Sequence, residues 1–251
     1  MTNRTKDNLL DKSLKIIQAF VDVNEGWGVR ELAAAMNYTV PTTHRILLQL
    51  KDHGIVEYQT DKNKYYIGTE LIRIGAKVAN TTPLQSITKP FLKTLAEKYE
   101  ETICLLMLRK DKKQIFWADK VNGPKPLQYI IPIGEMQPIP YGGSGKTILA
   151  FLENDLIEEI LNDEKFTSTE KESILTQLQH IRNEKVTSTV SERLEGSTGI
   201  ASPIFNHENH PVGSLLLTAP TPRVTPDVVK NASVDIRDAA KEISSILGSS
   251  L

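Results

Sequence analysis

Cysteine, long apolar runs and any excess of charge are what this sequence has little of. Cys104 is the single cysteine in 251 residues, which excludes an internal disulfide framework and is typical of proteins from a reducing cytoplasm. No apolar run approaches the roughly 18 residues that a membrane span needs, and residues 1–11 carry mixed charge, unlike a secretory signal. We therefore expect a cytoplasmic protein without membrane contact.

The charge balance limits how the chain could bind nucleic acid. Thirty Lys and Arg against 31 Asp and Glu give a net charge of −1. Residues 1–80 hold 11 basic and 9 acidic side chains (+2), which leaves 19 and 22 (−3) for the remainder. Neither part is a bulk basic field, so any nucleic-acid contact must come from a few placed cations. With 39% hydrophobic residues, the chain can bury a real core, and we expect two domains.

Residues 39–54 are the most informative stretch. Thr39 is suited to cap a helix, Pro41 fits its first turn and Gly54 ends it. At helical spacing, one face is apolar and is predicted to be buried: Thr43, Ile46, Leu47 and Leu50. The opposite face carries four other side chains: Pro41, Thr42, Arg45 and Gln49. Such a face either reads base edges and phosphates or is simply solvated.

The segments before residue 39 favour the DNA-reading interpretation. Residues 9–23 form a predicted amphipathic helix, and residues 30–36 form a second one. The apolar positions of the first helix are Leu10, Leu14, Ile17 and Val21. Two short helices, a tight turn and a third helix are the helix-turn-helix arrangement.

A hairpin is predicted directly after the third helix, from residues 55–58 and 65–68. A hairpin in this place is a wing. We expect Lys62 and Lys64 at its tip, where they would hold the DNA backbone without reading much sequence.

The remaining chain alternates between predicted helices and strands. Residues 69–79 form a connecting helix whose apolar stripe packs either on another chain or on its own domain, and residues 80–83 are the best boundary. Residues 84–100 are helical, divided or kinked at Pro90. Further helices are expected at 145–152, 155–161, 169–183 and 226–247, and strands at 102–109, 114–119, 127–133, 185–190, 199–205 and 212–218. The predicted fold is α+β, with a winged helix-turn-helix domain (1–68), a linker helix (69–83) and a second domain (84–251).

The glycine-rich run Gly142–Lys146 resembles two catalytic motifs without completing either. Pro140 stands where a phosphate-binding loop needs its first glycine, and Lys146 stands where a nucleophile elbow around Ser144 needs its last one. A glycine turn that opens a helix offers free N–H groups to a carboxylate, or else it serves only close packing. An enzyme or small-molecule-binding protein acting at this turn is the alternative function. His207 and His210 fit a surface turn better than a metal site, so no metal or cofactor is expected.

Taken together, the segments resemble the IclR family of bacterial transcription regulators. The N-terminal half carries the likeness in Ser13-Leu14-Lys15-Ile16-Ile17, Glu31-Leu32-Ala33, Thr42-Thr43-His44-Arg45-Ile46-Leu47, His53-Gly54-Ile55-Val56 and Tyr65-Tyr66-Ile67-Gly68. The C-terminal half carries it in Glu101-Thr102, Gly145-Lys146-Thr147-Ile148-Leu149-Ala150, Gly196 and residues 199–205. The resemblance implies a GAF-like effector-binding domain, and a homodimer through the N-terminal parts or a tetramer. It implies no enzymatic activity.

The resemblance also implies where a small organic effector would bind. The residues it points to are Tyr129, Gln137, Gly143, Ser144, Thr189, Ser197, Gly199, Leu216 and Thr218. Members that bind small keto acids carry a carboxylate, a cysteine and a serine at the positions of Thr189, Gly199 and Leu216. This pocket therefore has fewer polar anchors, and we expect a different effector, a small carboxylate or aromatic metabolite. Arg45, Thr42 and Gln49 are expected to read the major groove of a palindromic double-stranded DNA site.

Overall fold

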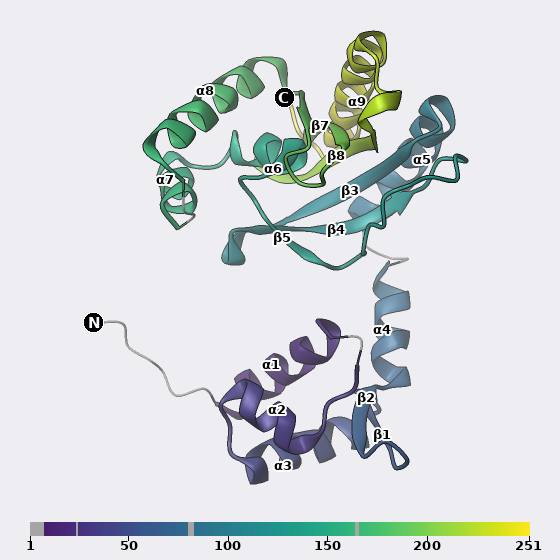
Figure 1. Cartoon of the computed structure of the whole chain (residues 1–251), viewed down its shortest axis with the longest axis vertical. Coiled ribbons are helices and arrows are strands. Elements are labelled where there is room, and N and C mark those ends of the chain that lie inside the picture. Colours follow the sequence, from purple (N-terminus) through teal and green to yellow (C-terminus); the bar gives the residue numbers. More distant parts are fainter. Residues whose placement is uncertain (1–7, 24, 80–82, 164–165) are drawn as a thin grey trace. The chain divides into compact units, whose positions relative to one another are not determined.

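The computed structural model describes residues 8–23, 25–79, 83–163 and 166–251. The chain divides into two compact units, Met1–Thr81 and Thr82–Leu251, each with a core of its own. Figure 1 traces the order of helices and strands in both units. The predicted boundary at residues 80–83 falls largely on residues 80–82, outside the described part. None of the described helices combines the length and the apolar composition needed to cross a membrane.

The first unit is a helix-turn-helix followed by a hairpin. Its elements are α1 (Leu9–Val21), α2 (Val29–Met36), α3 (Val40–Asp52), β1 (Val56–Gln59), β2 (Lys64–Ile67) and α4 (Thr69–Ala79). Thr39 caps α3 as predicted, because its Oγ1 accepts the N–H of Thr42 at 3.4 Å. The strands pair antiparallel, and Trp27 extends this sheet through two backbone hydrogen bonds of 2.9 Å with Tyr65. The wing is therefore anchored to the segment that precedes α2.

The predicted inner face of α1 is wrong. Leu10, Leu14 and Val21 are 66%, 50% and 58% exposed, whereas Ile16 and Phe20 are buried against the second and third helices' apolar side chains. Both sides of this helix are apolar, and periodicity alone cannot say which of two apolar stripes faces the core. The consequence is an apolar stripe on the surface of the first unit.

The second unit is built on a six-stranded antiparallel sheet in the order β5-β4-β3-β8-β7-β6. Its strands are β3 (Thr102–Arg109), β4 (Gln114–Val121), β5 (Met136–Pro138), β6 (Thr187–Val190), β7 (Ser197–Phe205) and β8 (Pro211–Pro220). Helices α5 (Pro83–Tyr99) and α9 (Pro226–Ile246) share one core with the sheet, and α6 (Gly142–Leu149), α7 (Asn154–Asp163) and α8 (Ser168–Glu184) share another (Figure 1). The predicted α+β fold is confirmed.

Two predictions about this unit need correction. Residues 127–133 are not a strand: Ile130 is 91% exposed, and the edge strand is β5, where Gln137 lies opposite Ile115. Pro124, Pro126 and Pro132 remove backbone donors in and beside this segment, so it cannot form a regular ladder. Pro90 does not divide the helix at residues 84–100, because α5 is continuous and keeps Pro90 exposed.

The start of α6 requires glycine at one position and tolerates a side chain two positions earlier. A Cβ added to Gly145 would lie 1.9 Å from the carbonyl oxygen of Ile139, whereas a Cβ on Gly143 would lie 3.4 Å from the Ala201 Cβ, an ordinary contact. We expect Gly145→Ala to lower the free energy of unfolding of the second unit by about 1–3 kcal/mol. Urea unfolding measures it, with Gly143→Ala as the matched control. Equal midpoints for the two variants would show that the contact is not close.

Candidate nucleic-acid interface and effector cavity

Helix α3 has one buried and one exposed face, as predicted. Thr43, Ile46, Leu47 and Leu50 are buried in the core of the first unit. Pro41, Arg45 and Gln49 are exposed on the other side, and Thr42 is half-buried. The Thr42 Oγ1 accepts a hydrogen bond of 2.9 Å from the Thr39 hydroxyl, which leaves its own O–H available to an outside acceptor. The exposed face therefore presents a guanidinium, an amide and a hydroxyl on a rigid helix.

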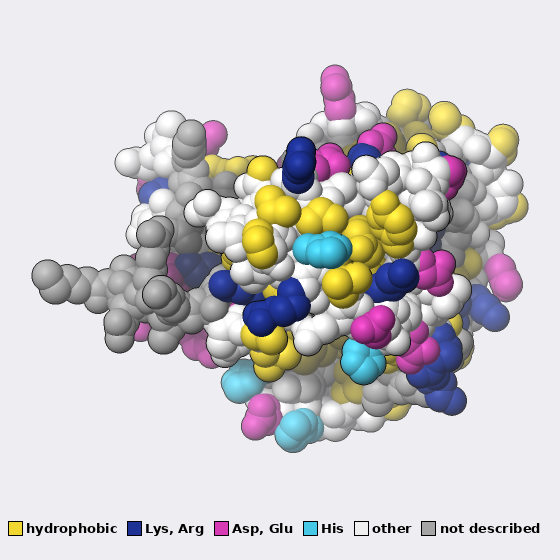
Figure 2. Space-filling view, turned by 90° about the horizontal axis from the view of Figure 1, so that it is seen from below, with side chains coloured by type: hydrophobic (Ala, Val, Ile, Leu, Met, Phe, Trp, Pro, Cys, Tyr) yellow, Lys and Arg dark blue, Asp and Glu magenta, His cyan; other side chains and the backbone are white. Residues whose placement is uncertain are grey.

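Sequence reasoning left out one side chain on this face. His44 is exposed and lies one helical turn before Leu48, which is exposed as well. Figure 2, seen from below the view of Figure 1, shows lysine and arginine side chains around an apolar patch. His44 lies three residues after Pro41 and four before Leu48, and this helical spacing could have identified it from the sequence. It was left out because the charges were counted over Lys, Arg, Asp and Glu alone. The face is a mixed surface with placed cations.

The two lysines of the wing differ in their surroundings. Lys62 lies in the exposed turn between β1 and β2, with its Nζ 5.2 Å from the centre of the Tyr66 ring. Lys64 is not at the tip as predicted; it is the first residue of β2, and its Nζ lies 3.3 Å from a carboxylate oxygen of Glu31. The Gly28 N–H, and after it Lys64, hold the pKa of Glu31 below its usual value. Lys62 is therefore the more available of the two.

Seven of the nine predicted effector residues line one cavity in the second unit. Gly143 and Ser144 come from α6, and the others come from three neighbouring strands: Thr189, Ser197, Gly199, Leu216 and Thr218. Trp117 closes the cavity from β4. Its free volume is about 30 Å³, which is room for little more than one water molecule. The cavity is nearly filled by the protein's own side chains.

The other two predicted residues contact the loop that closes this cavity, residues 191–196. The Tyr129 hydroxyl lies 3.5 Å from the carbonyl oxygen of Glu195. The Gln137 Oε1 accepts a hydrogen bond of 3.0 Å from the Nη1 of Arg193. Both residues therefore belong to the mouth of the cavity and not to its wall.

The first two N–H groups of α6 already have acceptors. The N–H of Gly142 donates to Glu192 Oε2 at 3.2 Å, and that of Gly143 donates to Thr189 Oγ1 at 3.0 Å. Lys146 is only 5% exposed, and its Nζ lies 2.6 Å from Glu192 Oε2. The Lys146 Nζ also donates to Gln177 Oε1 at 2.8 Å. A carboxylate does sit at the glycine turn, as the sequence suggested, but it belongs to the chain itself.

Arg193 fills the mouth of the cavity. Its Nη2 donates to the carbonyl oxygen of Pro138 at 3.1 Å and to that of Tyr141. Its Nε is buried without a hydrogen-bond partner among the described residues, and burial lowers the pKa of Arg193 to about 10. Sequence reasoning missed Glu192 and Arg193, because nothing local shows that their loop folds over a turn about 50 residues earlier.

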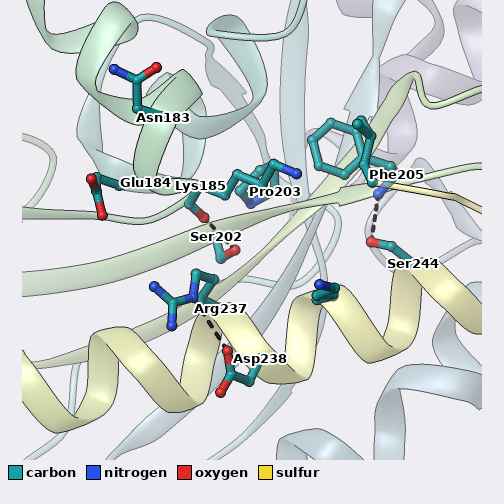
Figure 3. A pocket seen from close by; sticks show the side chains of 11 residues that line it. Asn183, Glu184, Lys185, Ser202, Pro203, Phe205, Arg237, Asp238 and Ser244 are labelled. Carbon is teal, nitrogen blue, oxygen red and sulfur yellow. Dashed lines mark hydrogen bonds and ion pairs between the residues drawn. The ribbon is translucent and has the colours of Figure 1, made fainter.

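A second cavity, of about 380 Å³, lies where the end of α8 and strand β7 face α9 (Figure 3). Its polar groups are largely bonded to one another: the Ser202 hydroxyl donates to the carbonyl oxygen of Lys185 at 2.6 Å, and the Ser244 Oγ accepts the N–H of Phe205 at 3.0 Å. Lys241 lines it as well. None of the predicted effector residues does, so this cavity is distinct from the one beside α6.

A winged helix-turn-helix joined to an α+β unit is an architecture found in DNA-binding regulators that carry a ligand-binding domain. Two family comparisons agree with this class. Residues 76–245 match the family described as the bacterial transcriptional regulator IclR C-terminal domain, and residues 9–60 match the IclR helix-turn-helix domain. The chain belongs to the IclR family, as the sequence motifs indicated, and is a DNA-binding transcription regulator with a ligand-binding C-terminal domain.

Similar proteins span nearly the whole chain at low identity. The HTH-type transcriptional regulator KipR of Bacillus subtilis (strain 168) is 24% identical, over 98% of this chain and 99% of the relative. The transcriptional repressor IclR of Escherichia coli (strain K12) is 23% identical, over 95% of this chain and 89% of its own. Both matches therefore extend over both units of this chain.

Solved structures share the fold. An IclR-type regulator from Silicibacter sp. TM1040 matches with a TM-score of 0.84 and 21% identity, over 97% of each chain. An IclR homologue from Microbacterium hydrocarbonoxydans, solved in complex with 4-hydroxybenzoate, matches with a TM-score of 0.80 and 18% identity, over 96% of this chain and 99% of that one. The described architecture is therefore a recurrent one.

The Thr189 hydroxyl is predicted to stabilise the wall of the cavity. Thr189→Val leaves the N–H of Gly143 without its acceptor, and an unmet hydrogen bond in a protein interior costs about 1–3 kcal/mol. We expect that loss in the free energy of unfolding of the second unit, measured by urea denaturation. Thr189→Ser keeps the hydroxyl and should lose much less. A valine variant as stable as the serine variant would refute this role.

Proposed function

We propose that α3 reads the major groove of a palindromic operator. Arg45, Thr42 and Gln49 are the reading side chains, and Pro41 lies against the bases or the backbone. The observation that carries the proposal is the exposed polar face of α3, which four buried side chains hold on the core of its unit. The wing lysines, Lys62 first and Lys64 after it, contact phosphates and contribute affinity more than specificity.

We propose a homodimer formed through the first unit and the linker helix, which pairs further into a tetramer or remains a dimer. The exposed stripe of α1 and the exposed apolar side chains of α4, Ile72, Ile74 and Val78, support this assembly. A dimer places two α3 helices on one DNA face. Helix-turn-helix dimers read half-sites whose centres lie about 10 bp or a multiple apart.

We propose that the cavity beside α6 binds a small organic effector, a carboxylate or an aromatic metabolite. The convergence of seven predicted residues on one cavity supports this site. The 4-hydroxybenzoate bound to the relative from Microbacterium hydrocarbonoxydans supports the ligand class. The effector acts by population shift: it binds one conformation of the second unit more tightly than another and so raises the population of that conformation. The change in DNA affinity cannot exceed the ratio of the effector's affinities for the two conformations.

We propose that the protein acts in the cytoplasm without a cofactor and is not an enzyme. Ser144 would be the nucleophile of the alternative function, an enzyme acting at the Gly142–Lys146 turn. Within the described residues its hydroxyl has no hydrogen bond to a histidine or a carboxylate, and the side chain is 2% exposed. An activated serine needs an adjacent base. The geometry therefore favours a binding site over a catalytic one.

Arg45→Ala tests the reading face. We expect it to lose about 1–3 kcal/mol on a specific site and to relax the base preference there, because an arginine fork discriminates one base pair. Lys62→Ala is the contrast: it should weaken all DNA about equally and flatten the salt dependence. Binding to matched and mismatched duplexes over a salt series measures both effects. An Arg45→Ala variant that keeps its sequence preference would remove Arg45 from the reading set.

Ile72→Glu tests the dimer. Ile72 is 62% exposed in the single chain, so the change should leave the first unit folded. In a dimer the glutamate would be a buried, unpaired charge. We therefore expect the dissociation constant of the dimer to rise at least about tenfold, measured by sedimentation equilibrium. Leu127→Glu, at a side chain 65% exposed on the other unit, is the matched control. If the two variants dissociate alike, the α4 stripe is not the interface.

A further inference from the structure

The Glu192 side chain has the position of a bound ligand. Its Oε2 accepts the N–H of Gly142 at 3.2 Å and lies 2.6 Å from the Lys146 Nζ. Glu192 is partly exposed, at the edge of the cavity, whereas Lys146 is almost completely buried. One carboxylate from a surface loop therefore reaches inward and neutralises an interior ammonium group.

Two cations lie near the Glu192 carboxylate. Arg193 lines the cavity together with Glu192, and Lys146, which does not line it, has its Nζ 2.6 Å from the Glu192 Oε2. The Nε of Arg193 is buried without a hydrogen-bond partner among the described residues. A buried cation is stable only with an anion beside it. The site beside Lys146 is thus suited to a carboxylate, and the carboxylate now bound there belongs to a loop residue and not to a strand of the sheet.

The loop of Glu192 also fills the space that a ligand needs. With Glu192 and Arg193 in place, the cavity has about 30 Å³ of free volume, too little for any organic acid. The loop is joined to the rest of the unit at its base: the N–H of Ser191 donates to the carbonyl oxygen of Ser197 at 2.7 Å, and the N–H of Gly196 donates to the Ser191 Oγ at 3.0 Å. Neither bond at the base of the loop involves the side chain of Glu192 or Arg193.

We propose that Glu192 is a built-in competitor of the effector: a carboxylate effector takes its place on Lys146 and the N–H of Gly142, and the Glu192 side chain moves into solvent. The proposal rests on the effector site proposed above. The exchange keeps the charge of the site constant, since one carboxylate replaces another. It makes Lys146 and Glu192 determinants of specificity, because an uncharged isostere cannot replace the carboxylate beside a buried ammonium.

The competitor lowers the affinity of the site in a measurable way. A site that is free for only a fraction of the time binds with an affinity reduced by that fraction. Removing the charge of Glu192 therefore tightens carboxylate binding, while the loss of its ion pair with Lys146 makes the ligand-free unit less stable. A residue with a purely structural role would lower stability without raising affinity.

The test is calorimetric titration with three carboxylates, acetate, benzoate and 4-hydroxybenzoate, each paired with its amide. The proteins are the unmodified full-length chain, Glu192→Gln, and Glu195→Gln as the matched control on the same loop. We expect Glu192→Gln to bind at least one carboxylate about tenfold tighter than the unmodified chain, and Glu195→Gln to bind it as the unmodified chain does. The amides should show no gain. Lys146→Met should lose the preference for the carboxylate over its amide.

Each outcome decides the proposal. Equal carboxylate affinity in Glu192→Gln and the unmodified chain, an equal gain for the amide, or no carboxylate binding by Glu192→Gln overturns it. Lys241→Gln changes the second cavity and should leave carboxylate binding unchanged. If this variant binds carboxylates more weakly, the binding site is the second cavity and the proposal is overturned. All proteins are also tested for retention of DNA. If the titrations show that Glu192 does not compete with carboxylates, while the proteins still retain DNA, only this inference is contradicted. If the unmodified chain retains no DNA, the proposed function is contradicted.

Discussion

The burial of one ammonium group, that of Lys146, is a constraint on the residues beside the start of α6. Lys146 lies on the short helix α6, which packs so closely on the carbonyl oxygen of Ile139 that Gly145 has no room for a side chain. The buried ammonium needs an anion beside it. Glu192 supplies that anion from a loop, which joins the stability of the ligand-free unit to the occupancy of its binding site.

The DNA-reading unit follows the opposite principle. Its α3 helix is fixed by buried apolar side chains, and its exposed face carries no ion pair among the described residues. A reading head gains from rigidity, because side chains held in place lose less entropy when they meet base edges. This contrast between the two units suits a regulator that reports a ligand through DNA affinity.

The sequence predicted what depends on local periodicity and missed what depends on distant contacts. The buried and exposed faces of α3 were predicted correctly, because spacing determines them. The helix expected at residues 145–152 begins three residues earlier, so the glycines form its first turn and not a turn before it. The prediction for the inner face of α1 was wrong because both sides of this helix are apolar. The prediction of a strand at residues 127–133 was wrong because prolines in and beside the segment lack the N–H groups that strand pairing needs. The roles of Glu192 and Arg193 join residues about 50 positions apart, and a single sequence does not show such pairs.

The most direct test of a ligand-responsive regulator is capture of its operator. The pure full-length protein is incubated at moderate salt with sheared genomic DNA from its source organism, and the retained fragments are sequenced. We predict enrichment of one palindromic sequence, with half-site centres about 10 bp or a multiple apart, and loss or gain of that enrichment when a metabolite mixture is added. Retention without sequence preference, or none at any salt concentration with or without metabolites, would contradict the central claim.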